Sequence, residues 1–231
     1  MTRTRVDLAL CLAVDVSASI DFDEFGLMLG GYAAAFRDPE IAAALTAGPR
    51  GAVMAAAVFW SGTAPPPEVA VPWTLLDGAE AAGRFAAALE EAPRLPQPGA
   101  TALGEGMAAG LALLARCPAE AARHVLDVSG DGAHNQGRPP GPVRDLGVAA
   151  GVTINALAVL DEEGPALLRH FREHVIGGPG SFVMDCASYA DFAAAIRLKL
   201  LREIGEGGAL ISRGVPPHPP VVQEGGPPSV A

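Results

Sequence analysis

The stretch AVDVSASIDFDEF, residues 13–25, decides how the fold begins. It starts inside an apolar run, residues 6–14, which has one acidic interruption and stops at Asp15. Two hydroxyl side chains follow at alternate positions, Ser17 and Ser19, and an acidic segment comes next. A short apolar run that ends in polar residues indicates a buried strand, and the acids that follow indicate the start of a helix.

The same alternation of apolar runs and helical patterns continues to about residue 204. Further strands are expected at residues 51–62, 68–76, 123–132, 152–160 and 181–187. Helices are expected at residues 23–38, 78–92, 100–117, 141–151, 164–175 and 189–204. This order predicts an α/β fold with a mainly parallel sheet of about six strands and helices on both faces. Pro72 predicts an edge or a bulge in the second of these further strands.

The chain divides by composition into one domain, residues 1–204, and a tail, residues 205–231. The tail is rich in Gly and Pro and has no apolar period, which is typical of a disordered segment. Its PPHPP sequence is also compatible with a polyproline helix that binds a groove. A solvated tail without a partner is the simpler interpretation.

Charge and cysteine content exclude several classes of protein. The chain of 231 residues has a formal charge of −10, which disfavours nucleic acid as a partner and suits a cation or a basic protein surface. Its three cysteines, Cys11, Cys117 and Cys186, are widely spaced and form no CxxC pair. We therefore expect neither a disulfide framework nor a zinc site, but small buried apolar side chains.

The N-terminus resembles an export signal in part, because MTRTR precedes an apolar run. Asp7 interrupts that run, and Asp15 rather than a small-residue cleavage site follows it, so we interpret it as the first strand. No window of about 18 apolar residues predicts a membrane span. The sequence as written predicts a cytoplasmic protein, or a secreted or periplasmic one if the true start lies upstream.

Three segments carry oxygen side chains to one edge of the predicted sheet. One follows the first strand, one opens the helix at 100–117, and one is the Asp-Gly turn that ends the strand at 123–132. Ligand sites in such folds lie beyond the carboxyl ends of the strands. Two carboxylates and three hydroxyls form a hard donor set that suits Mg²⁺, and Mn²⁺ could substitute. The candidate ligands are Asp15, Ser17, Ser19, Thr101 and Asp131.

These segments, DVSAS, the Thr101 loop and SGDG, resemble the metal-ion-dependent adhesion site (MIDAS) of von Willebrand factor A (vWA) domains. The resemblance covers about residues 6–204 and implies a Rossmann-like three-layer sandwich. It also implies that the five candidate ligands hold the metal and that an acidic residue of a partner protein completes its coordination. Segments such as VLDVSGDG and AGVTINALAVL look like an uncharacterised bacterial group of these domains, known only as a domain of unknown function.

One position departs from the common pattern of the family. vWA domains often have a hydroxyl residue just before the second Asp-Gly, where this chain has Gly130. Ser129 could shift to fill that role, or water could. The departure concerns the surroundings of the metal more than its ligands.

A simpler interpretation explains some of these residues as helix caps. Asp15 could be an acid at a helix N-terminus, and Ser17 or Ser19 an N-cap, although neither interpretation accounts for the match at the other two segments. The acids that follow are interpreted as a solvated helix start and not as metal ligands; they are Asp21, Asp23 and Glu24.

Other polar residues near the predicted edge have two open interpretations. Asp127 could point at the rim of the site or pair with Arg123. His134 and Asn135 could contact a ligand at the rim, but such residues more often shape a turn. None of these is assigned to the metal.

Three functions are compatible with the sequence. The leading hypothesis is a noncatalytic module that binds a protein through its metal. A Mg²⁺-dependent phosphatase-like hydrolase is the alternative, but it needs a second acid where the chain has Ser17, and the single lysine, Lys199, lies in the last predicted helix. A scaffold that no longer uses metal is the third.

Overall fold

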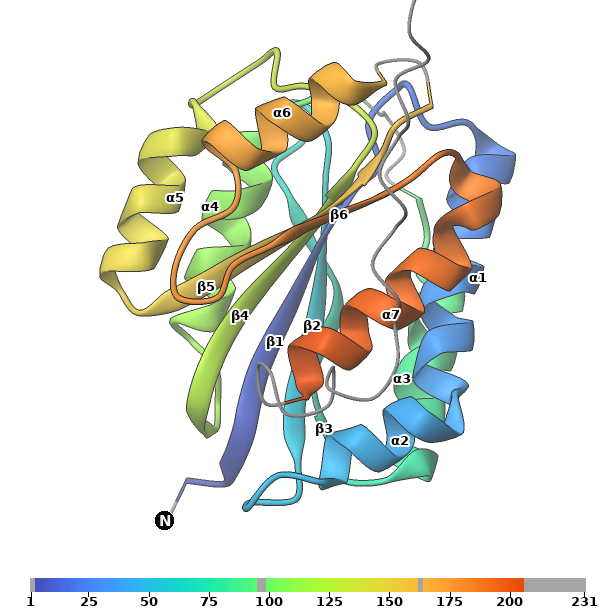
Figure 1. The fold of residues 1–231 in the computed structure, drawn as a ribbon, viewed down its shortest axis with the longest axis vertical. Coiled ribbons are helices and arrows are strands. Elements are labelled where there is room, and N and C mark those ends of the chain that lie inside the picture. The colour runs from blue at the N-terminus through green and yellow to red at the C-terminus, as the bar shows by residue number, and fades with distance from the viewer. Residues whose placement is uncertain (1–2, 95–98, 162–163, 206–231) are drawn as a thin grey trace, which may run out of the picture.

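The computed structural model describes residues 3–94, 99–161 and 164–205. Within them a six-stranded sheet has the order β3-β2-β1-β4-β5-β6 (Figure 1). The strands are β1 (Arg5–Asp15), β2 (Val53–Trp60), β3 (Glu68–Leu76), β4 (Glu120–Gly130), β5 (Val152–Val159) and β6 (Val183–Cys186). The helices are α1 (Phe22–Arg37), α2 (Pro39–Thr46), α3 (Ala79–Glu90), α4 (Leu103–Leu114), α5 (Pro140–Ala149), α6 (Pro165–His174) and α7 (Phe192–Ile204), with a short 3₁₀ helix, η1 (Tyr189–Asp191). The predicted tail lies outside these residues, apart from Gly205.

The sheet is parallel except at one edge. β1 pairs in parallel with β2 and β4, and β5 pairs in parallel with β4 and β6. β3 pairs antiparallel with β2 at the edge, and its register shifts next to Pro72, between the pairs at Ala55 and Ala57. The predicted α/β class, the mainly parallel sheet and the edge strand with a bulge are confirmed.

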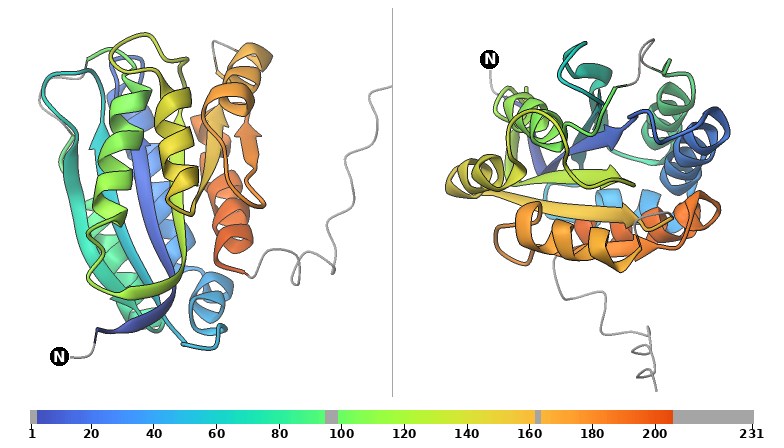
Figure 2. Two further views of the ribbon diagram at one scale, coloured as in Figure 1. Left: turned by 90° about the vertical axis from the view of Figure 1, so that its left-hand side faces the viewer. Right: turned by 90° about the horizontal axis from the view of Figure 1, so that it is seen from above.

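Helices cover both faces of the sheet, so the fold is a Rossmann-like three-layer sandwich (Figure 2). Residues of α1, α2, α3 and α7 share one core with alternate side chains of β1, and residues of α4, α5 and α6 share the other core. β1 is buried on both sides because it lies in the middle of the sheet. This central position explains why the sequence before Asp15 is almost continuously apolar.

The start of α1 corrects the capping interpretation of the first loop. Asp21 is the N-cap and forms a capping box with Glu24, in which each side chain accepts from the other residue's backbone N–H. Ser17 and Ser19 therefore cap no helix, and their hydroxyls remain available at the edge of the sheet. The acids at 21 and 24 are cap residues rather than only solvated charges.

A further helix, α2, is absent from the sequence prediction. Asp38 caps it by accepting from the N–H of Glu40, and Pro39 occupies its first position. An N-cap acid followed by proline is a recognised helix start. The prediction missed it because the helix is short and follows α1 without a loop.

Two sets of small residues pack in the core, and the burial of the cysteines was predicted. The three cysteines are free and buried. The glycines of α4 serve helix packing, since a Cβ at Gly106 would lie 2.3 Å from the Trp60 ring and one at Gly110 would lie 2.4 Å from Leu126. None of the helices found in the described residues is long and apolar enough to cross a membrane.

Candidate metal centre

The predicted ligands of the first and third segments lie together at the carboxyl edge of the sheet. Asp15 ends β1 and Asp131 directly follows β4, and these strands are hydrogen-bonded neighbours. The Ser19 hydroxyl donates to Asp131 Oδ1 at 2.9 Å and lies 3.1 Å from the Ser17 hydroxyl. The Ser17 N–H donates to Asp15 Oδ1 at 2.8 Å. A continuous polar chain thus joins four of the five candidates.

Thr101 joins this group through the loop before α4. The Ala18 N–H donates to the Gly99 carbonyl at 2.9 Å, which ties this loop to the first segment. A Cβ built at Gly132 would lie 3.1 Å from Thr101 Oγ1, so this hydroxyl lies against the Asp-Gly turn. Asn135 accepts from the Thr101 N–H at 2.9 Å and donates back to its carbonyl at 3.1 Å. Asn135 therefore shapes the turn that holds Thr101.

No cationic side chain among the described residues pairs with the two carboxylates. Asp15 is fully buried, and its Oδ2 has no hydrogen-bond partner in the described part of the chain. Burial, and then the charge of Asp131, raises the pKa of Asp15 well above its usual range. Burial also raises the pKa of Asp131. Within the described ranges neither residue forms an ion pair with Lys, Arg or His.

Tyr189 closes one side of this acidic group. Its hydroxyl lies beside Asp131 but makes no hydrogen bond of good geometry with a described residue. Burial and the charges of Asp131 and Asp15 raise the pKa of Tyr189, so its hydroxyl stays neutral. Tyr189 adds no positive charge to the site.

These residues fit a hard divalent ion. Their donors are all oxygen, and the charge of two carboxylates matches that of one divalent cation. The unpartnered Oδ2 of Asp15 is a buried acceptor that a cation would satisfy, and a buried carboxylate without a partner is costly. The described residues contain no group of three or more His, Cys, Asp or Glu side chains arranged to hold a metal. A metal here would depend on the hydroxyls as well as the two carboxylates.

The departure at Gly130 has a steric consequence. A Cβ there would lie 2.9 Å from Asp15 Oδ2, so a side chain at this position would require the carboxylate to move. Ser129 does not take the missing hydroxyl's role in this structure, because its Oγ accepts from the Tyr32 hydroxyl at 3.1 Å inside the core. Water remains the other predicted substitute.

Arg94 is a functional candidate that the sequence analysis missed. Its guanidinium donates to the carbonyls of Ser17, at 3.4 Å, and Ile20, and it lies 5.8 Å above the Phe25 ring. These contacts hold the loop between β1 and α1 in place. No sequence motif marks an arginine that acts through backbone carbonyls, so Arg94 could not be predicted.

Asp127 is not part of this site, and it does not pair with Arg123 as one interpretation proposed. It is fully buried, and its Oδ1 lies 2.5 Å from Lys199 Nζ in α7. Arg123 instead donates to the carbonyls of Glu203 and Ile204 at the end of α7. The strand therefore turns Asp127 into the core and away from the edge.

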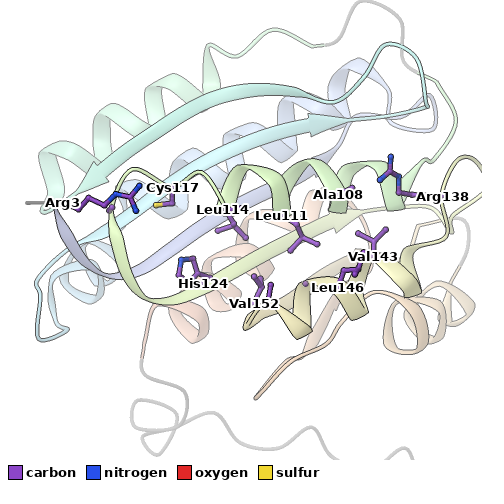
Figure 3. Close-up of a pocket in the computed structure, with 14 residues that line it drawn as sticks. Arg3, Ala108, Leu111, Leu114, Cys117, His124, Arg138, Val143, Leu146 and Val152 are labelled. Carbon is purple, nitrogen blue, oxygen red and sulfur yellow. The ribbon is translucent and has the colours of Figure 1, made fainter.

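A groove of about 460 Å³ lies between α4, α5 and β4 (Figure 3). Its walls are mostly apolar, with Leu111, Leu114 and Val143 along it, and Arg3 and Arg138 near its ends. None of the five candidate ligands lines it. The groove is separate from the candidate metal centre.

The fold is that of a vWA-like α/β domain. The chain belongs to the family described as "Protein of unknown function (DUF1194)", which matches residues 5–207. A search of curated proteins found no match.

Solved structures with this fold share little sequence with the chain. A mussel byssus protein, proximal thread matrix protein 1, whose structure has a zinc-occupied MIDAS motif, is 15% identical with a TM-score of 0.62, over 86% of this chain and 48% of its own. A von Willebrand factor type A structure from Catenulispora acidiphila is 15% identical with a TM-score of 0.62, over 87% and 43%. The pilus adhesin SpaC from Lactobacillus rhamnosus GG is 15% identical with a TM-score of 0.61, over 88% and 31%. This chain thus spans less than half the length of each.

Proposed function

We propose that this chain is a noncatalytic module that binds another protein through a divalent metal ion. The ligands would be Asp15, Ser17, Ser19, Thr101 and Asp131, and the ion would be Mg²⁺ or Mn²⁺. The observation that carries the proposal is the buried Oδ2 of Asp15, which has no partner within the described residues, beside a second carboxylate without a cation. Zinc in the MIDAS motif of the byssus protein supports a metal at this edge of the fold.

The bound ion would supply attraction for a further carboxylate. Two protein carboxylates neutralise a divalent charge, and neutral hydroxyl ligands leave the ion able to attract a third acid. The partner would therefore present an Asp or Glu side chain. The chain's own negative charge makes nucleic acid an unsuitable partner.

The surface beside the site offers an apolar contact for such a partner. Phe22 is the first residue of α1 and is 77% exposed, three positions after Ser19. A single exposed aromatic is common on protein surfaces, but its position next to the proposed metal suits an interface. We propose an acidic partner residue with an apolar neighbour that contacts Phe22.

An exported location agrees with this function better than a cytoplasmic one. The structures with the same fold include a byssus thread matrix protein and a pilus adhesin. The cytoplasmic prediction is therefore the weaker of the two.

Catalysis receives less support than binding. Ser17 stands where the hydrolase alternative needs a proton-donating acid, and Lys199 is fully buried away from the edge. A metal-free scaffold would leave the Asp15 carboxylate buried without compensation. The metal-free scaffold makes the opposite prediction in the test below.

Paramagnetic line broadening tests the binding proposal even when affinity is weak. Mn²⁺-loaded protein is mixed with a short peptide that contains one Asp, and with a matched peptide that contains Asn instead. We expect broadening of the Asp side-chain signals alone, and its loss with the Asp131→Asn protein. Equal broadening of both peptides, or none at millimolar peptide, would contradict a carboxylate-binding metal site.

A further inference from the structure

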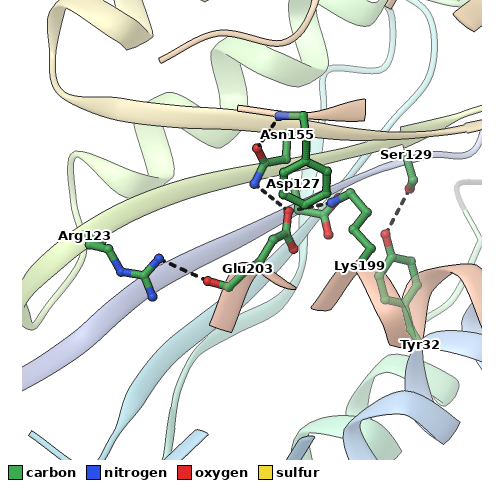
Figure 4. A network of polar contacts seen from close by, with 8 residues as sticks. Tyr32, Arg123, Asp127, Ser129, Asn155, Lys199 and Glu203 are labelled. Carbon is green, nitrogen blue, oxygen red and sulfur yellow. Dashed lines mark hydrogen bonds and ion pairs between the residues drawn. The ribbon is translucent and has the colours of Figure 1, made fainter. Parts of the chain in front are cut away.

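A second acidic cluster lies inside the core, between the sheet and α7 (Figure 4). Lys199 Nζ is 2.5 Å from Asp127 Oδ1 and 2.6 Å from Glu203 Oε1. Lys199 and Asp127 are fully buried, and Glu203 is 2% exposed. Asn155 donates to Glu203 Oε1 at 2.9 Å, and the Phe182 ring lies 5.8 Å from Nζ. The cluster is almost fully buried and has an aromatic wall.

The choice of lysine at this position is unusual for this chain. Lys199 is the single lysine among 16 Lys and Arg residues. Arginine is better suited to a buried ion pair, because its planar guanidinium makes paired hydrogen bonds. Lysine differs in that its amine can lose a proton and act as a nucleophile. The single lysine of the chain, the one basic side chain that can become a neutral amine nucleophile, thus lies against two buried carboxyl groups.

The Asp127 carboxyl group is poorly solvated. Neither of its oxygens accepts a hydrogen bond of normal geometry from a described residue, despite the short contact with Lys199. Burial and the charge of Asp127 raise the pKa of Glu203 to about 8, so Glu203 is protonated near neutral pH. Lys199 Nζ and Asp127 Oδ1 are close enough for a proton to pass directly between them.

We propose that Lys199 and Asp127 condense to form an intramolecular amide bond, with Glu203 transferring the protons. In this reaction Lys199 first passes one proton to Asp127, and the resulting amine attacks Asp127 Cγ and forms the C–N bond. Glu203 donates its proton to the departing Asp127 hydroxyl, the C–O bond breaks, and water leaves. Glu203 regains its proton from the amide nitrogen, so it ends unchanged. The reaction needs no oxidant, reductant or further reactant.

The fold supplies what this condensation requires. Amide formation is unfavourable in water, but holding the two groups in contact can give an effective concentration of about 10⁵–10⁸ M. The water produced has a way out, because a groove of about 760 Å³ is lined by Glu203, Asn155 and Phe182. The bond would fix α7 to β4, and it does not depend on the metal proposed at the other end of the strand.

The mass of the full-length purified protein tests the proposal directly. Under denaturing conditions we expect a deficit of one water molecule. Trypsin should then release a branched peptide that joins residues 124–144, which contain Asp127, to residues 198–202, which contain Lys199. An unmodified mass would overturn the proposal and leave an ion pair.

Peptide mapping separates the amide from two other dehydrations. A deficit of one water with the two peptides unjoined would indicate a cyclic imide, for example at Asp131-Gly132, and would overturn the proposal. A deficit of one ammonia with residues 198–202 joined to residues 145–169 would assign the bond to Asn155 and would overturn the role of Asp127.

Two variants test the roles of the nucleophile and the proton carrier. Lys199→Arg keeps the charge but removes the amine, so a folded protein of unmodified mass is expected. Glu203→Gln should slow amide formation by about 10²–10⁴-fold, the usual contribution of general acid–base catalysis. A water deficit that persists in Lys199→Arg, or amide formation at the wild-type rate in Glu203→Gln, would contradict these roles.

Discussion

Strand β4 holds two aspartates in opposite electrostatic situations. Asp127 points into the core and lies 2.5 Å from Lys199 Nζ. Asp131, just beyond the end of the strand, accepts a hydrogen bond from Ser19 and lies near Asp15, and no described cation pairs with either carboxylate. Asp127 and Glu203 thus have Lys199 as a partner within the fold, whereas Asp15 and Asp131 have no such partner among the described residues.

This difference suggests a structural role for one cluster and a binding role for the other. The cluster that contains Lys199 is complete without solvent, so it can fix α7 to the sheet. A cluster without a cation pays a desolvation penalty that an ion from solution can remove. The same strand thus serves the core at one position and, in our proposal, a ligand at the other.

The largest expected effect comes from removing Lys199. Lys199→Met should lower the free energy of unfolding by about 3–5 kcal/mol, because Asp127 would remain buried without its partner, whether an ion pair or an amide joins the two in the wild type. Urea unfolding measures this change. Arg84→Met, which breaks only the exposed pair with Glu80, is the control and should change stability little. A loss of less than about 1 kcal/mol in Lys199→Met would show that Lys199 does not stabilise the buried Asp127 carboxyl group.

The internal cluster should also control how stability depends on pH. Glu203 has a pKa of about 8 in the folded protein and an ordinary value near 4.5 when exposed. Because the folded pKa is raised, its contribution is complete below the ordinary value and is lost as pH rises through about 8. The free energy of unfolding should therefore fall by several kcal/mol between about pH 5 and pH 8.

Glu203→Gln provides the matched comparison for this pH dependence. Gln does not titrate, so the fall in stability over the same pH range should become much smaller in the variant. Chemical unfolding at both pH values measures the difference. Identical pH slopes in the two proteins would show that Glu203 is not protonated in the core.

At the candidate metal centre, removing a charge should raise the free energy of unfolding instead of lowering it. In chelator, Asp15→Asn should raise the free energy of unfolding by about 1–2 kcal/mol, because it removes a buried charge that no described cation neutralises. The same variant should lose the stabilisation that Mg²⁺ gives the wild type. Asp23→Asn, an exposed acid of α1, is the control for surface charge. Destabilisation of Asp15→Asn in chelator would contradict an uncompensated carboxylate.

The smallest effect is expected from the arginine that holds the metal loop. Arg94→Met removes donors to the Ser17 and Ile20 carbonyls and should weaken Mg²⁺ binding by about tenfold or less. Calorimetry against Arg84→Met isolates this effect from the loss of a surface charge. Unchanged affinity would limit Arg94 to a packing role.

Much of the fold could be predicted because buried strands consist mainly of apolar residues. β1 is apolar on both faces because helices cover both sides, and Pro72 correctly marked an irregular edge strand. α2 was missed because it follows α1 directly. The capping box was missed because it begins at Asp21 and not at Ser19. Local signals for both were present in the sequence.

The polar clusters were predictable to different degrees. Ser17 and Asp131 lie next to strand ends, so the parallel topology brings them to one edge, as expected. The contact of Asp127 with Lys199 depends on how α7 packs across the sheet, which no local pattern encodes. Whether the candidate ligands hold a metal remains a prediction.

Calorimetry of metal-free protein with Mg²⁺, on wild type and Asp15→Asn, tests the central claim most directly. The claim is that the carboxylates at the edge of the sheet lack a cation and take one from solution. It predicts binding of one ion per chain in the wild type and none in the variant. No binding to the wild type, or equal binding to both proteins, would contradict it.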